Sequence, residues 1–181
     1  MEFKKVLSLL IKNFEEKNIR YALIGGFSLI AYGIPRTTLD IDFLIDKDDL
    51  YKLDEIMNKL NYKLIYRTEN VSQYKGIDEE MGEIDFIHAF RKYSKNMLER
   101  YEIREIEDIK VKVLKPEDMI GLKVQAIANS PERKIKELYD IESIVEKFKD
   151  NIKWEVVKEY FEIFELNKDF EEIFKKYGNF K

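Results

Sequence analysis

The chain has 181 residues, of which 45% are hydrophobic and 38% charged, and its formal net charge is −4. This length and composition allow a substantial buried core, and they exclude a largely disordered protein. The absence of cysteine excludes disulfides and thiolate metal sites, and the single histidine disfavours zinc, so oxygen atoms would have to hold any bound metal.

The N-terminal residues MEFKKVLSLLIKNFEEK carry apolar side chains at helical spacing, which predicts an amphipathic helix. Their apolar stretch is too short for a signal peptide, and no small-residue cleavage site follows it. Because no apolar run approaches the roughly 20 residues that span a bilayer, we expect a cytoplasmic protein with no membrane partner.

The next stretch, residues 21–45, reads YALIGGFSLIAYGIPRTTLDIDFLI. Its pattern predicts a strand over 20–24, a turn at Gly25 and Gly26, a helix to about residue 32 and a second strand over 37–45. Asp40 and Asp42 are two residues apart in that second strand. Because strand side chains alternate between faces, we expect both carboxylates to project from the same side of a sheet.

Beyond residue 46 the pattern again alternates between helical and extended spacing. Pro116 is well placed to begin a helix, whereas the polar segment 92–108 gives no clear assignment. We expect an edge strand at 110–114. The remaining predicted elements are helices over 49–60, 116–129, 132–149, 153–165 and 168–177, and strands over 62–67, 72–75 and 82–90.

This order predicts an α+β fold: a mixed β-sheet backed by helices, followed by a C-terminal helical bundle. The predicted boundary separates a core over residues 1–114 from a helical region over 115–181, which we expect to pack on the core.

A third acid, Asp85, follows in the apolar run GEIDFIHAF. Three carboxylates brought close together repel one another, and a bound cation relieves that repulsion. With oxygen as the only ligand type, Mg²⁺ or Mn²⁺ is the expected ion, with Asp40, Asp42 and Asp85 as its ligands.

The diglycine turn adds a feature that suits a phosphate group. Backbone without a Cβ atom at Gly25 and Gly26 lets phosphate oxygens approach closely, and amide groups of a following helix point at an anion. Ser28 could add a hydroxyl, and Arg36 a charge-assisted hydrogen bond. Together these residues predict a site for a nucleoside triphosphate and one or two metal ions.

Two groups of motifs resemble known families. Gly25-Gly26-Phe27-Ser28, with Asp40-Ile41-Asp42-Phe43 following after thirteen intervening residues from Gly26, resembles the signature of the nucleotidyltransferase superfamily related to DNA polymerase β. Asp85 resembles its third carboxylate. The run VLKPEDMIGLK at 113–123, followed by ELYDI at 137–141, resembles the AbiEii-type toxin nucleotidyltransferases and their uncharacterised relatives.

The resemblance implies a nucleotidyltransferase-type sheet and a role for each motif residue. It implies that Gly26 and Ser28 hold the triphosphate, that Asp40 and Asp42 bind the metals, and that Asp85 shares one metal and helps deprotonate the acceptor. Lys123 and Asp140 would complete the nucleotide-binding site from the helical region. The sequence departs from the family at one point, because a serine often follows the first glycine directly, whereas Ser28 comes two residues after Gly26.

The expected activity is the Mg²⁺-dependent transfer of a nucleoside monophosphate from a nucleoside triphosphate such as ATP to a hydroxyl acceptor. The AbiEii resemblance implies a toxin of a toxin–antitoxin pair, with RNA such as a tRNA end as acceptor and an antitoxin protein as partner. The negative net charge favours a protein or small-molecule acceptor almost as well. The alternatives are a catalytically inactive nucleotide-binding or protein-interaction module on the same fold, and a purely structural partner.

Overall fold

The structure, a computed structural model, describes residues 1–178. The chain divides into two compact units, Met1–Leu114 and Lys115–Lys181, which are treated separately below. Within the described residues no helix is long and apolar enough to cross a membrane.

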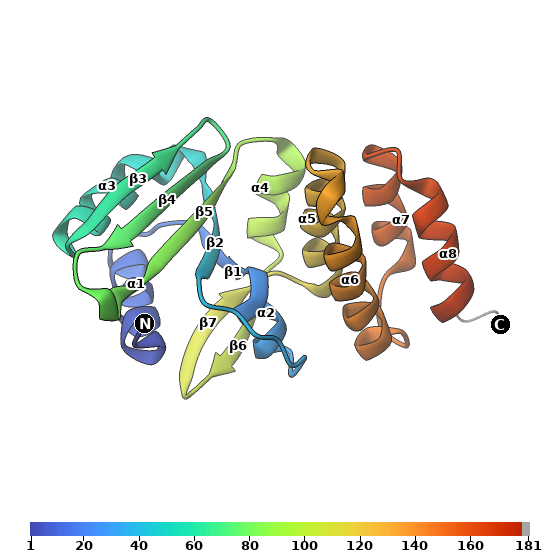
Figure 1. Cartoon of the computed structure of the whole chain (residues 1–181), viewed down its shortest axis with the longest axis horizontal. Helices are drawn as coiled ribbons and strands as arrows, with labels where there is room; N and C mark the ends of the chain where they lie inside the picture. The colour runs from blue at the N-terminus through green and yellow to red at the C-terminus, as the bar shows by residue number, and fades with distance from the viewer. Residues whose placement is uncertain (179–181) are drawn as a thin grey trace. The chain divides into compact units, whose positions relative to one another are not determined.

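The first unit is built on a seven-stranded mixed sheet with the strand order β3-β4-β5-β2-β1-β7-β6 (Figure 1). The pairs β1–β7 and β2–β5 are parallel, and the remaining neighbours are antiparallel. The strands are β1 (Tyr21–Ile24), β2 (Ile41–Asp46), β3 (Tyr62–Arg67), β4 (Val71–Gly76), β5 (Glu83–Ala89), β6 (Glu102–Ile106) and β7 (Ile109–Val113).

Helices α1 (Phe3–Glu16) and α3 (Leu50–Lys59) pack on one face of this sheet. Phe14 of α1 is fully buried, and its ring contacts those of Tyr21, Phe43 and Phe86 on three different strands. Full burial of such a side chain contributes about 1.5–3 kcal/mol. Helix α2 (Gly25–Ala31) follows β1 directly, and α4 (Lys92–Glu99) contacts β2.

The second unit contains α5 (Pro116–Asn129), α6 (Lys134–Phe148), α7 (Trp154–Ile163) and α8 (Asn167–Tyr177). Pro116 lies at the start of α5, where its missing N–H removes no helical hydrogen bond. Gly121 lets α5 approach α7, since a Cβ atom there would lie 2.8 Å from the Tyr160 ring. The Tyr160 hydroxyl donates a 2.6 Å hydrogen bond to Asp118 in the same interface.

The predicted α+β class, with a mixed sheet backed by helices and a helical C-terminal region, is confirmed. Two details of the prediction are wrong, and one segment left without an assignment is resolved. The second strand begins at Ile41 instead of residue 37, so Asp40 lies just before β2. The segment 92–108 holds α4 and β6, and β7 lies between β1 and β6 instead of at an edge. Strand partners distant in the sequence decide these details, so local spacing does not reveal them.

Candidate active site

Two of the three predicted acids lie side by side on adjacent strands. Asp42 of β2 and Asp85 of β5 are direct Cα partners in the parallel pair, so their side chains project from the same face of the sheet. Both residues are half-buried, whereas Asp40 is exposed at the entrance to β2. The opposite face of β5 carries Phe86 and His88, which are buried.

The diglycine turn contacts this pair of acids directly. Gly25 has the left-handed backbone angle φ +67°, and a Cβ atom built on it would lie 2.0 Å from Oδ2 of Asp42. A side chain at position 25 would therefore occupy the space of the carboxylate. Gly26 is close to Thr38, whose Cβ would lie 2.5 Å from an added Cβ atom. Both glycines are thus required by the close approach of the 33–40 loop and β2.

Asp85 is the acid whose environment is most clearly perturbed. Burial raises the pKa of Asp85 above its ordinary value, and the hydrogen bond that it accepts from Gln73 opposes this rise. The negative charges of Asp40 and Glu83 raise the pKa further. Asp40 therefore lies within electrostatic reach of Asp85. An added positive charge would stabilise the ionised form of Asp85.

The described residues contain no group of three or more His, Cys, Asp or Glu side chains that could hold a metal ion as they stand. The donor atoms at this site are nevertheless all carboxylate oxygens, which suits a hard cation such as Mg²⁺. The missing Cβ atom of Gly25 lets the Asp42 carboxylate lie directly against the turn. The residues therefore fit a divalent metal by chemistry, and binding would require the carboxylates to close on the ion.

Two further predicted residues belong to the segment between β1 and β2. Ser28 is buried, and its hydroxyl donates a 2.7 Å hydrogen bond to the carbonyl oxygen of Gly25. This bond fixes the first turn of α2 and leaves the hydroxyl lone pairs, but not its proton, for another partner. Arg36 is half-buried in the loop that joins α2 to β2. No described side chain caps the start of α2.

In the second unit, Lys123 of α5 lies between two acids of α6. Its Nζ atom is 2.6 Å from Oδ2 of Asp140 and 3.1 Å from Oε2 of Glu137, and Arg133 also pairs with Glu137. The side chains of Glu137 and Asp140 are each only 4% exposed, so the lysine offsets charge that would otherwise be costly to bury.

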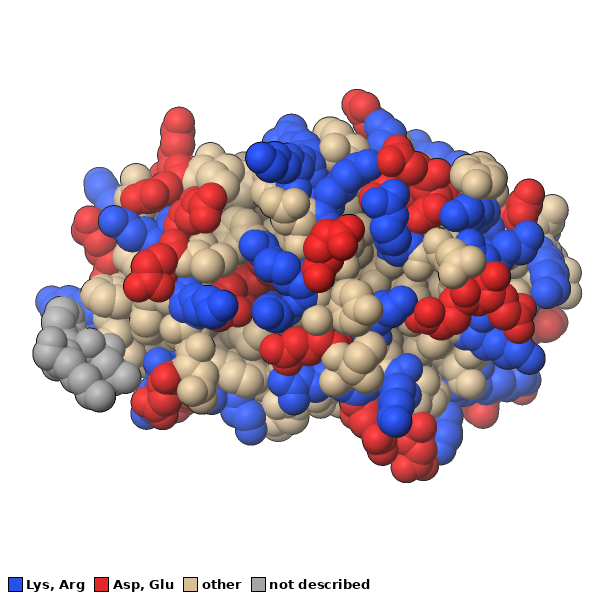
Figure 2. All heavy atoms as spheres, turned by 180° about the vertical axis from the view of Figure 1, so that it is seen from behind, with Lys and Arg blue, Asp and Glu red and all other residues tan. Residues whose placement is uncertain are grey.

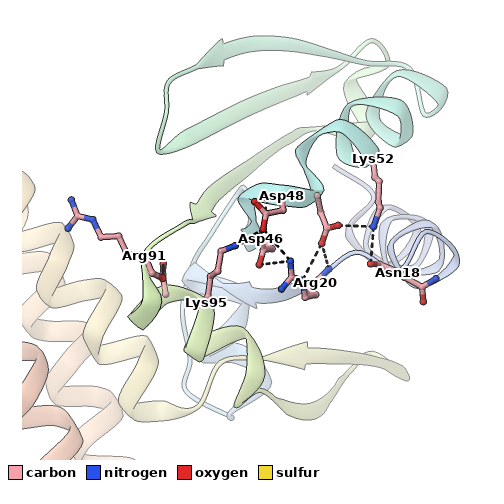
Figure 3. Close-up of polar contacts among 9 residues, drawn as sticks. Asn18, Arg20, Asp46, Asp48, Lys52, Arg91 and Lys95 are labelled. Atoms are coloured by element: carbon pink, nitrogen blue, oxygen red, sulfur yellow. Dashed lines mark hydrogen bonds and ion pairs between the residues drawn. The ribbon is translucent and has the colours of Figure 1, made fainter.

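In the first unit, the acids that follow Asp42 form a separate network at the C-terminal end of β2. Asp46 is buried and pairs with Arg20 at 2.8 Å and with Lys95 at 3.2 Å (Figure 3). Its carboxylate also accepts a 2.9 Å hydrogen bond from the backbone N–H of Asp48. Asp49, also buried, accepts from the Arg20 backbone N–H and from Lys52. These contacts join β1, β2, α3 and α4 and assign the cluster a structural role.

Gln73, whose side chain reaches the site, could not be identified from local sequence patterns. Gln73 is the Cα partner of Asp85 on β4, and its Nε2 donates a 3.2 Å hydrogen bond to Oδ2 of Asp85. The only available signal was the alternation of residues 72–75, which places Gln73 and Lys75 on one face. It does not identify the neighbouring strand.

Comparison with known proteins gives one family and several similar structures. The model of a family described as uncharacterised nucleotidyltransferase matches residues 3–174. No curated protein matches the sequence. Among solved structures, ANT(2″)-Ia in complex with adenylyl-2″-tobramycin aligns with a TM-score of 0.68 at 14% identity, over 89% of this chain and 95% of that one.

Two other structures are similar over most of their length. The lincosamide antibiotic adenylyltransferase LnuA, with lincomycin bound, has a TM-score of 0.56 at 17% identity, over 77% of this chain and 94% of that one. An antigenic nucleotidyltransferase-like protein from Paracoccidioides brasiliensis has a TM-score of 0.58 at 20% identity, over 96% and 92%. At these identities the likeness shows a shared fold.

Proposed function

Because the chain belongs to the family of uncharacterised nucleotidyltransferases, we propose that it transfers a nucleoside monophosphate from a nucleoside triphosphate to a hydroxyl acceptor, with Asp40, Asp42 and Asp85 as its catalytic acids. The observation that supports these residues is the pairing of Asp42 with Asp85 across β2 and β5, with the Gly25 backbone against the Asp42 carboxylate. This arrangement sets the glycine turn directly beside two acids on one face of the sheet.

In the proposed reaction the acceptor oxygen bonds to the α-phosphorus, the bond between the α- and β-phosphates breaks, and pyrophosphate leaves. The hydroxyl proton passes to the carboxylate of Asp85. An ionised carboxylate within reach of the acceptor hydroxyl can take its proton as a general base. The bare backbone of Gly25 and Gly26, with the Ser28 hydroxyl and the Arg36 guanidinium, would hold the triphosphate.

Asp40, Asp42 and Asp85 would hold Mg²⁺ or Mn²⁺, which when bound neutralises charge on the phosphates and on the leaving pyrophosphate. We assign Lys123 and Asp140 a contact with the nucleotide on the family resemblance alone. That contact would require Lys123 to exchange a carboxylate partner for a phosphate.

Surface charge and the similar structures both bear on the class of acceptor. On the face shown in Figure 2, basic and acidic side chains are interleaved and form no broad basic surface. An extended RNA backbone binds best to a continuous basic surface, so this face is not an RNA-binding surface. Two similar structures also hold small molecules, adenylyl-2″-tobramycin and lincomycin. The interpretation of the chain as a toxin that modifies a tRNA end and is bound by an antitoxin rests only on the motifs at 113–123 and 137–141.

The test is to incubate the full chain with radiolabelled nucleoside triphosphates, Mg²⁺ and cell lysate, and to compare it with Asp42→Asn. The matched control is Asp108→Asn, which removes an exposed carboxylate from the turn between β6 and β7. We expect labelled product from the native chain and from the control, and a loss of at least about 100-fold for Asp42→Asn. Equal labelling by all three would refute the assignment.

Calorimetry separates the alternatives. Tight nucleotide binding without transfer to any acceptor would identify an inactive nucleotide-binding module. If the chain binds neither nucleotide nor metal, the remaining alternative is that it is a structural partner of another protein. Labelling confined to an RNA band would support the toxin interpretation and count against a small acceptor.

A further inference from the structure

A row of side chains extends the site outward across the sheet. Asp42 of β2, Asp85 of β5, Gln73 of β4 and Tyr66 of β3 are successive Cα partners on four adjacent strands. Because partners in register project from the same face, all four side chains lie on the face that carries the acids. Tyr66 ends this row at the sheet edge and is 51% exposed.

A β-bulge is what turns Tyr66 toward this face. The register of β3 against β4 shifts between Leu64 and Tyr66, so that Ile65 is the extra residue. Without the shift Ile65 would stand opposite Gln73, and Tyr66 would point to the face covered by α3. The next residue supports this orientation: Arg67 pairs with Asp54 of α3 at 2.6 Å, so alternation directs Tyr66 to the opposite face. Bulges often re-aim side chains beside active sites.

The two ends of the row carry different groups for the proposed reaction. The glycine turn lies on the β1 side of Asp42, and Asp85, Gln73 and Tyr66 lie on the other side. In an in-line displacement the attacking hydroxyl and the leaving pyrophosphate lie on opposite sides of the α-phosphorus. If the turn holds the triphosphate, the acceptor approaches from the side of β5, β4 and β3.

From this geometry, and resting on the proposed function, we propose that Tyr66 and Gln73 form the acceptor-binding platform of the site. The acceptor is a small, ring-bearing hydroxyl compound. Its ring lies on the exposed face of Tyr66 while its hydroxyl reaches Asp85, which Gln73 holds in place through the 3.2 Å hydrogen bond. Neighbouring strands are about 4.8 Å apart, so the two contacts are about 10 Å apart, the length of two linked rings.

The experiment measures pyrophosphate release from ATP and Mg²⁺ by the full chain. The added hydroxyl compounds are glycerol, which has no ring, and adenosine, tobramycin and lincomycin, which have rings. The variants are Tyr66→Ala, Tyr66→Phe and the control Tyr51→Ala, which removes a 64% exposed tyrosine of α3. Thermal unfolding of each variant and calorimetric ATP binding are measured in parallel.

We expect at least one ring compound to serve better than glycerol with the native chain. Tyr66→Ala should raise the KM for that ring compound about tenfold, because the compound loses its aromatic stacking partner. Hydrolysis of ATP by water, ATP binding and the glycerol rate should not change. Tyr66→Phe and Tyr51→Ala should behave like the native chain.

Three results would overturn the platform and leave the proposed function intact. One is an unchanged KM in Tyr66→Ala, and another is no advantage of any ring compound over glycerol. The third is weaker ATP binding by Tyr66→Ala, which would place the nucleobase on this ring. A native chain that binds no ATP and releases no pyrophosphate with any compound, water included, would instead refute the proposed function, and the platform with it.

Discussion

Replacing Gly25 by alanine tests whether the glycine turn and the acids form one site. The new Cβ atom would lie 2.0 Å from Oδ2 of Asp42, whereas carbon and oxygen atoms approach only to about 3.3 Å. The Asp42 carboxylate must therefore move by roughly 1.3 Å or the turn must open. A displacement of about 1 Å at a reacting centre costs about 100-fold in rate. We expect Gly25→Ala to lose transfer activity by about that factor.

The same substitution also strains the backbone. At φ +67° an alanine costs about 1–2 kcal/mol of folding free energy, whatever its side chain contacts. Gly33 supplies the matched control, because it has φ +72° in the same segment but lies outside the diglycine turn. Gly33→Ala should lose the same backbone contribution of about 1–2 kcal/mol in urea unfolding and keep full activity.

Binding of Mn²⁺ and ATP by calorimetry completes the comparison. Gly25→Ala should bind Mn²⁺ in the presence of ATP at least tenfold more weakly than Gly33→Ala, since only the first variant displaces a carboxylate. If both variants bind and transfer alike, contact between the turn and Asp42 has no part in the chemistry, and the proposed site is wrong.

Three other outcomes follow from individual contacts. Gln73→Leu should weaken Mn²⁺ binding about tenfold by freeing Asp85, with unfolding nearly unchanged; equal affinity would show that the hydrogen bond does not position the ligand. Lys123→Met should lower the free energy of unfolding by about 3–5 kcal/mol because its two buried carboxylate partners lose their lysine, and an unaltered urea curve would contradict this. Burial raises the pKa of Asp49, but its hydrogen bonds outweigh that effect and the net pKa is lowered. Its folded-state bonds therefore stabilise the protein above the ordinary pKa of about 3.9 and are lost as pH falls through the lower folded value. The stability difference between the native chain and Asp49→Asn, measured by urea unfolding from pH 7 downward, should shrink in acid; a constant difference would refute it.

Much of this architecture is predictable from local sequence. Pro116 and the spacing after it predict the helix over 116–129, which the structure reproduces, and the strand at 62–67 is also correct. The order of the predicted strands and helices suffices to predict the fold class. Short-range signals such as turns, caps and apolar periodicity determine these features, because each depends on residues within a few positions.

The remaining features depend on partners distant in the chain. Nothing around Asp85 says that β5 pairs in parallel with β2, or that Gln73 lies opposite it on β4. The extra residue at Ile65 appears only when β3 and β4 are placed in register. The polar segment 92–108 folds as α4 and β6 because its few apolar residues, such as Met97 and Ile106, find buried positions. Tertiary contacts outweigh weak local preference there.

The irregularity in β3 has a second consequence, for solubility. β3 is an outer strand that exposes Leu64, Ile65 and Tyr66 in succession, and such a strand invites pairing with another copy of the chain. One surplus residue interrupts the ladder and makes the edge a poor template for that pairing. Deleting Ile65 would regularise the ladder and leave Tyr66 opposite Gln73, so it should make the edge prone to aggregation without moving the tyrosine from the face of the acids.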